Sequence, residues 1–129
     1  MPQGFKISAV SAGLKKNGKR DLALIVSEAP AVVAGVFTRN RVQAAPVVLD
    51  RQRLAGGVCR AIIANSGNAN CCTGKKGMED AVSMTAAVSD AFDIDPALVM
   101  AASTGVIGEP LKIDSVLAAV PGLISALSS

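Results

Sequence analysis

Short apolar runs rich in β-branched residues recur along the chain between turn-forming residues, and such runs are typical of buried strands. Five of them are present, at residues 21–27, 32–38, 45–49, 59–64 and 98–102. The run at residues 21–27 is continuous and is ended by Glu28-Ala29-Pro30.

Helical periodicity is clearest between Met78 and Phe92, where apolar residues recur every three or four positions and Glu79 and Asp80 would occupy the first turn. Asp50 is placed to cap a short helix over residues 51–55, which Gly56 and Gly57 would end. Two further short helices are predicted, one over residues 113–117 and one beginning at Pro121. Strands early in the chain and strand–helix alternation later predict an α/β (α+β) fold.

Composition indicates one domain, residues 1–129, in which 50% of residues are hydrophobic and only 18% are charged. Globular proteins usually contain about 25% charged residues, so we expect either strands covered on both faces or a surface partly covered by another polypeptide. No apolar run approaches the roughly 20 residues that a membrane helix needs, and the first residues lack the pattern of a signal peptide. The three cysteines do not form a disulfide framework, so a cytoplasmic protein is expected.

The net charge of +3 and the three phenylalanines argue against nucleic-acid binding, which needs stacking platforms and a more basic groove. Four cations do cluster near the start of the chain, at Lys15, Lys16, Lys19 and Arg20. From the sequence alone we interpret this cluster as a solvated basic turn.

Histidine is absent, which excludes Ser-His-Asp and Cys-His catalysis from this chain alone. The three cysteines lack the paired spacing of a zinc site, so no metal is predicted. Cys71 and Cys72 fit small buried fillers better than nucleophiles, because only Lys75 and Lys76 could stabilise a thiolate.

The segment Asn65-Ser66-Gly67-Asn68-Ala69-Asn70 follows a predicted strand and has two interpretations. It could shape a substrate site, or its amides could bond the neighbouring backbone in Asx turns, which the sequence alone favours. The segment matches neither a phosphate-binding loop nor a nucleophile elbow. A phosphate loop would need four residues rather than six before Gly74-Lys75, and a nucleophile elbow would need Gly where Ala64 is found.

Ser103-Thr104-Gly105 follows the last predicted strand and could place donors around one point. A threonine hydroxyl and a backbone N–H can stabilise the oxyanion of a tetrahedral intermediate without any histidine. The alternative is a simple glycine turn before Pro110, and spacing alone favours that turn.

A series of motifs makes the chain resemble the N-terminal part of the ornithine acetyltransferases, the bifunctional glutamate N-acetyltransferase (amino-acid acetyltransferase) family of arginine biosynthesis. These motifs extend along essentially the whole chain, and their order makes the resemblance specific. They are Gly4-Phe5, Ala12-Gly13-Leu14-Lys15, residues 21–25 (DLALI), 34–40 (AGVFTRN), 44–47 (AAPV), 60–70 (RAIIANSGNAN), 72–74 (CTG) and 102–108 (ASTGVIG).

The resemblance implies a multifunctional acyltransferase whose precursor cuts itself before a threonine, giving an α and a β chain in an αββα sandwich of the N-terminal-nucleophile type. The β-chain threonine attacks N-acetylornithine, its own amine acts as base, and the acetyl group passes to glutamate. An α2β2 heterotetramer is implied, with no cofactor; whether acetyl-CoA is also a donor stays open. Thr104 and Gly105 are implied to form the oxyanion hole.

The family's nucleophile and its substrate-binding threonine and lysine have no match in this sequence, so substrate-binding residues in this chain are unknown. We therefore expect the N-terminal portion of an α chain, inactive by itself. Two alternatives are a related self-cleaving amidohydrolase or aminopeptidase, and a non-catalytic assembly fragment.

Overall fold

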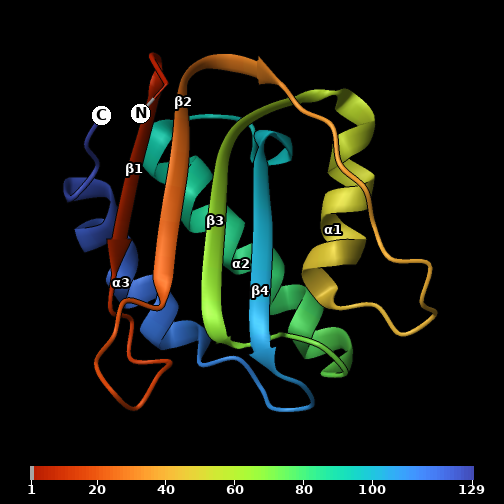
Figure 1. Ribbon diagram of the computed structural model, residues 1–129. Coiled ribbons are helices and arrows are strands. Elements are labelled where there is room, and N and C mark those ends of the chain that lie inside the picture. Colours follow the sequence, from red (N-terminus) through yellow and green to blue (C-terminus); the bar gives the residue numbers. More distant parts are fainter. Residues whose placement is uncertain (1) are drawn as a thin grey trace.

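The computed structural model describes residues 2–129, which fold into a four-stranded sheet with helices packed behind it (Figure 1). The strands are β1 (Phe5–Val10), β2 (Leu22–Val32), β3 (Val58–Asn68) and β4 (Val99–Val106), adjacent in that order. β1–β2 and β2–β3 are antiparallel, whereas β3–β4 is parallel. The helices are α1 (Ala45–Arg53), α2 (Gly74–Phe92) and α3 (Ile113–Ser125), with 3-10 turns η1 (Leu54–Gly56) and η2 (Pro96–Leu98). The predicted α/β class is confirmed.

The core lies between the sheet and the two helices behind it, α2 and α3 (Figure 1). Alternate strand residues point into this layer, and α2 and α3 contribute residues at helical spacing. The largest fully buried core side chains are Leu22, Leu24, Ile63, Met84, Val88, Val99, Val116 and Leu123. α2 also makes the crossover that a parallel β3–β4 pair requires.

The opposite face of the sheet is also apolar, although no helix of residues 2–129 covers it (Figure 1). Strand register aligns two rows across this face. One row is Ile7, Ile25, Ile62 and Met100, and the other is Ala9, Ala23, Ala64 and Ala102. Ile7 and Ile25 are 44% and 43% exposed, whereas Met100 on β4, the strand that α1 contacts, is only 4% exposed. The row of small residues would let a second layer of polypeptide approach closely.

The strand predicted at residues 32–38 is wrong, because β2 ends at Val32 and the chain then leaves the sheet. Val33 still donates to the Gly57 carbonyl, but Val36 beyond it is 99% exposed. No neighbouring strand accompanies this segment in the described residues, so its apolar run has no ladder to join.

The strand predicted at residues 45–49 is also wrong, because this segment is the first half of α1. Pro46 lies in the first turn, where a missing N–H costs nothing. Asp50 is therefore inside the helix rather than its cap. Its carboxylate accepts from the Ala101 N–H at 2.9 Å, and Arg53 donates to the Val99 carbonyl. These two side chains thus hydrogen-bond to backbone groups on the outer edge of β4 that a further strand would otherwise pair with. Burial raises the pKa of the Asp50 carboxyl to about 6.

Three smaller differences from the predictions concern one strand and two helices. β1 was not predicted, because its Lys6 and Ser8 interrupt the apolar pattern. α2 begins at Gly74, four residues before the predicted start. The two helices predicted after Pro110 are one, α3, since Val116, Val120 and Leu123 form a single buried stripe that continues past Pro121. None of the helices in the described residues is long and apolar enough to cross a membrane.

Candidate functional site

The parallel strands β3 and β4 end side by side and bring the two polar motifs together. Ser66 is aligned with Thr104, and Gly67 with Gly105. Thr104 is exposed and shares with Ser66 a hollow of about 210 Å³ on the uncovered face of the sheet. The hollow is also lined by Ala9, Arg20, Asp21, Leu22, Ala23, Ala64 and Asn65.

Gly105 and Gly67 allow the two strand ends to approach more closely than side chains would permit. Both have positive φ, 137° and 104° respectively. A Cβ added to Gly105 would overlap the Gly67 carbonyl carbon and lie 2.5 Å from the Asn68 nitrogen. Glycine at position 105 is therefore required by contact with backbone as well as by φ.

The amide side chains of residues 65–70 lie at the end of β3 and just after it, since β3 continues to Asn68, and they tie this segment to β4 and to the residues that follow β4. Asn65 accepts a hydrogen bond from the Ser103 hydroxyl at 2.6 Å and donates to the Asn68 carbonyl at 2.9 Å. Asn68 donates to the carbonyls of Glu109 (3.0 Å) and Pro110 (3.2 Å). Local Asx bonding therefore explains only part of the motif, because three of these four bonds connect different segments.

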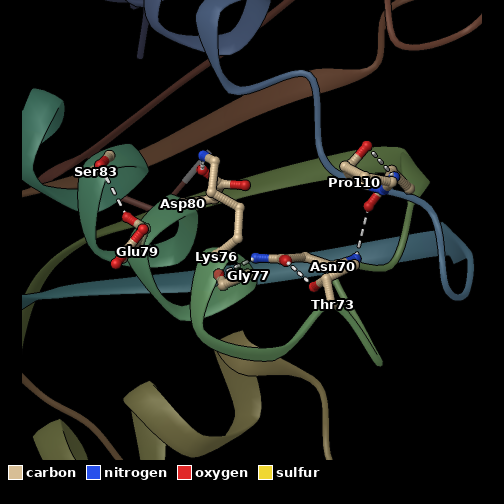
Figure 2. Close-up of polar contacts among 9 residues, drawn as sticks. Asn70, Thr73, Lys76, Gly77, Glu79, Asp80, Ser83 and Pro110 are labelled. Atoms are coloured by element: carbon tan, nitrogen blue, oxygen red, sulfur yellow. Dashed lines mark hydrogen bonds and ion pairs between the residues drawn. The ribbon is translucent and has the colours of Figure 1, made fainter.

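Asn70 instead orders the start of α2 (Figure 2). Its side chain is fully buried, donates to the Gly77 carbonyl at 2.8 Å and accepts from the Thr73 hydroxyl at 3.1 Å. Lys76 forms an ion pair with Asp80 one turn further along the helix. These contacts have a structural role and lie within the helix start rather than at the Thr104 hollow.

The cysteines do not contribute to the Thr104 hollow. Cys59 and Cys71 are buried, and burial raises the pKa of both thiols, which disfavours thiolates. Cys72 is exposed, so its assignment as a buried filler is wrong; Asn70 (φ 47°) and Cys72 (φ 61°) both adopt the left-handed conformation in this turn. Among residues 2–129, no group of three or more His, Cys, Asp or Glu side chains could hold a metal ion.

Asp21 was not singled out from the sequence, yet it fixes the loop beside the hollow. Its carboxylate is buried and accepts from the backbone N–H groups of Ala12 (2.6 Å), Leu14 (2.7 Å) and Lys15 (2.9 Å). The Asp21 carbonyl also accepts from the Ser66 N–H at 2.8 Å. The loop that carries the four clustered cations is thus anchored to the end of β3. The only sequence signal was a single carboxylate next to a glycine-containing loop.

Comparison with known proteins is consistent with this arrangement. The profile of the ArgJ family matches residues 6–129. The arginine biosynthesis bifunctional protein ArgJ of Geobacter sulfurreducens is 50% identical over 127 residues, 98% of this chain and 32% of the relative. That of Caldanaerobacter subterraneus is 51% identical over 128 residues, 99% of this chain and 31% of the relative. The chain thus spans about a third of the length of these relatives.

Two solved structures share the fold. The arginine biosynthesis bifunctional protein ArgJ of Bacillus halodurans has a TM-score of 0.87 and 42% identity, over 92% of this chain and 62% of its own. Ornithine acetyltransferase of Mycobacterium tuberculosis, solved in complex with ornithine, has a TM-score of 0.90 and 44% identity, over 98% of this chain and 69% of its own. With the family profile matching nearly all of its residues, this chain belongs to the ArgJ family.

Proposed function

We propose that this chain supplies the oxyanion hole of an acetyltransferase that moves the acetyl group of N-acetylornithine to glutamate in arginine biosynthesis. The observation that carries the proposal is the exposed Thr104 hydroxyl at the paired ends of β3 and β4, next to a glycine whose position is fixed by backbone contact. Membership of the ArgJ family, and the name of the M. tuberculosis relative, support the reaction.

In the proposed first step, the N-terminal threonine of a companion chain attacks the acetyl carbonyl with its hydroxyl. The threonine's own amine takes the hydroxyl proton. The carbonyl oxygen gains negative charge and rests on the Thr104 hydroxyl and the Gly105 N–H, which stabilise it by about 3 kcal/mol per donor. The amide C–N bond then breaks, ornithine leaves with the proton, and an acetyl ester remains on the threonine. The amine of glutamate then attacks this ester. A second oxyanion forms on the same two donors, and its collapse releases N-acetylglutamate and regenerates the threonine hydroxyl.

The uncovered sheet face supports a companion chain as partner. Ile7, Ile25 and the row of alanines have no covering layer in residues 2–129, and exposed apolar patches of this kind mark interfaces. We assign this face to the sheet of a β chain from the same precursor, giving an αββα sandwich within an α2β2 cytoplasmic enzyme. Thr104 and Ser66 lie on that face, so the interface would bring the nucleophile to the site.

The test is an assay of the full-length protein with N-acetylornithine labelled in its acetyl group. Transfer of the label to glutamate, with release of ornithine, is expected. Release of labelled acetate at the same rate with or without glutamate would instead indicate an amidohydrolase. Absence of both products from a preparation that contains the companion chain would leave only an assembly role.

A further inference from the structure

We propose that the basic loop, defined here by Lys15, Lys16, Lys19 and Arg20, is a phosphate-binding surface that holds the phosphate-bearing part of an acyl donor at the Thr104 site. This inference rests on the proposed acetyl transfer, because it places the donor's acyl carbonyl at Thr104 and Gly105. It assigns a ligand-binding role to residues that the sequence alone indicated only as a solvated turn.

Charge is the first argument. Four cations lie within six consecutive residues, in a chain whose net charge is only +3. The ion pairs among residues 2–129 are Lys6–Glu28, Lys75–Glu79 and Lys76–Asp80, and none involves the basic loop. Lys16, Lys19 and Arg20 are exposed. The loop therefore presents a concentrated positive field to solvent.

Asp21, the carboxylate that directly follows the basic loop, does not neutralise this field by pairing with a cation. Asp21 is 3% exposed, and its two oxygens accept three backbone N–H groups. These bonds hold residues 12–15 in place, and Lys19 N–H adds a bond to the Asn17 side chain at 3.2 Å. A loop that is already ordered loses little conformational entropy when it binds a ligand.

Position is the third argument. The Lys15 Cγ lies 3.2 Å from where a Cβ of Gly67 would be, and Gly67 is in contact with Gly105. Arg20 lines the same hollow as Thr104 and Ser66. The basic loop therefore borders the Thr104 site at both ends of the cation cluster, and one ligand could reach both.

The number and spread of the cations select the ligand class. A single carboxylate needs one cation, such as Arg20 in the hollow itself. Four cations along a loop fit a group with several negative charges, and Lys and Arg both bind phosphate oxygens strongly. Since the acyl group would rest on Thr104, the phosphates belong to the part of the donor that extends away from the acyl carbon.

The experiment compares the assembled full-length enzyme with a loop variant in which Lys15, Lys16, Lys19 and Arg20 are replaced by Gln. A matched control replaces four exposed cations elsewhere, Arg39, Arg41, Lys75 and Lys112, by Gln. Binding is measured by calorimetry with two probes, acetyl-coenzyme A, which carries three phosphates, and acetyl-pantetheine, which carries none. Inorganic pyrophosphate tests whether phosphate alone is recognised.

We expect the loop variant to bind acetyl-coenzyme A at least tenfold more weakly than the parent, and the control variant to bind it within twofold. Acetyl-pantetheine binding, which involves no phosphate, should stay within twofold in all three proteins. Pyrophosphate should compete with acetyl-coenzyme A in the parent and in the control variant, but not in the loop variant. If the loop variant is too unstable to use, Arg20→Gln alone and the salt dependence of the parent replace it, with several-fold weaker binding between 0.05 and 0.5 M salt, about a threefold change in Debye length.

Equal affinity of the loop and control variants for acetyl-coenzyme A would overturn the proposal, as would absence of binding to the parent. A loop-dependent KM for glutamate without any effect on acetyl-coenzyme A would assign the cations to a carboxylate and also overturn it. Loss of acetyl transfer in Thr104→Ala with unaltered probe binding leaves both proposals intact. Probe binding by an enzyme that transfers no acetyl group would refute the proposed function but not the phosphate-binding surface.

Discussion

Gly105 lies directly against the backbone of Gly67, with no room for a side chain between the ends of β4 and β3. This contact fixes the backbone of Thr104 beside that of Ser66. It also means that the candidate site depends on two strands that are distant in sequence, so its geometry is established only when the sheet is formed.

Gly105→Ala is expected to destabilise the fold by about 3 kcal/mol or more, because the added methyl group overlaps backbone that cannot rotate away and φ is 137°. Urea denaturation followed by circular dichroism measures the effect. Gly108→Ala is the control: it also has positive φ (85°) but opens into free space, so only strain of about 1 kcal/mol is expected. Equal losses in the two variants would show that the 67–105 contact is not tight.

Thr104→Ala in the complete enzyme is expected to lower the turnover number about a hundredfold, because one donor to the oxyanion is lost. Thr104→Ser keeps a hydroxyl and should retain turnover within about tenfold. Ser66→Ala, which removes the neighbouring hydroxyl from the same hollow, should change turnover only slightly. Since Thr104 is exposed, the unfolding midpoint should not move. Near-normal turnover of Thr104→Ala would remove this residue from the mechanism.

Asp50 should make stability depend on pH between about 4 and 6. Its pKa is raised by burial from 3.8 to about 6, so the folded protein binds more protons than the unfolded chain in this interval. The contribution of Asp50 is therefore most favourable below pH 4, declines as the pH rises to 6 and is constant above about 7. After allowance for partial exposure, the decline should be about 1 kcal/mol.

The test is Asp50→Asn, which keeps an oxygen that can accept from the Ala101 N–H but cannot ionise. The unfolding free energy of both proteins is measured from pH 4 to 7.5. The parent should lose stability relative to the variant as the pH rises. A difference that does not vary with pH would contradict the raised pKa.

Gly77→Ala and Gly122→Ala should differ sharply although both glycines lie in helices. A Cβ at position 77 would overlap the Thr73 hydroxyl and lie 2.7 Å from the Asn70 Oδ1, which disrupts the buried Asn70 network. A loss of about 3 kcal/mol is expected. Nothing lies within 4 Å of a Cβ at position 122, so alanine there should be neutral or stabilise α3 by up to about 1 kcal/mol. Thermal unfolding of the two single variants decides between them.

The parts of the fold that were predictable are those in which local pattern and tertiary contacts agree. The strands at residues 59–64 and 98–102 and the helix at 78–92 have apolar residues at the period that the structure uses. Residues 45–49 read as a strand because Val47, Val48 and Leu49 are β-branched or apolar. In the structure they form the first half of a helix whose Asp50 and Arg53 hydrogen-bond to β4, a tertiary contact that the local pattern does not contain.

The candidate site was predictable only in part, for a similar reason. Thr104 and Gly105 followed from a strand end and from resemblance to a family, and their roles are still predictions. Their neighbours Ser66, Arg20 and Asp21 became visible only when the sheet register was known. Asp21 in particular is one carboxylate among 10 acidic residues, and its three N–H partners are set by the path of the preceding loop.

The side chains of Asp50 and Arg53 hydrogen-bond to backbone groups on the outer side of β4. On the outer side of β1, Ser128 exchanges two backbone hydrogen bonds with Ile7. Both margins of the sheet are thus partly sealed by groups from the same chain. A newly synthesised copy that has reached this state offers little template for lateral growth into fibrils or for strand exchange. In the proposed assembly, this leaves the apolar sheet face as the surface through which a companion chain would pack.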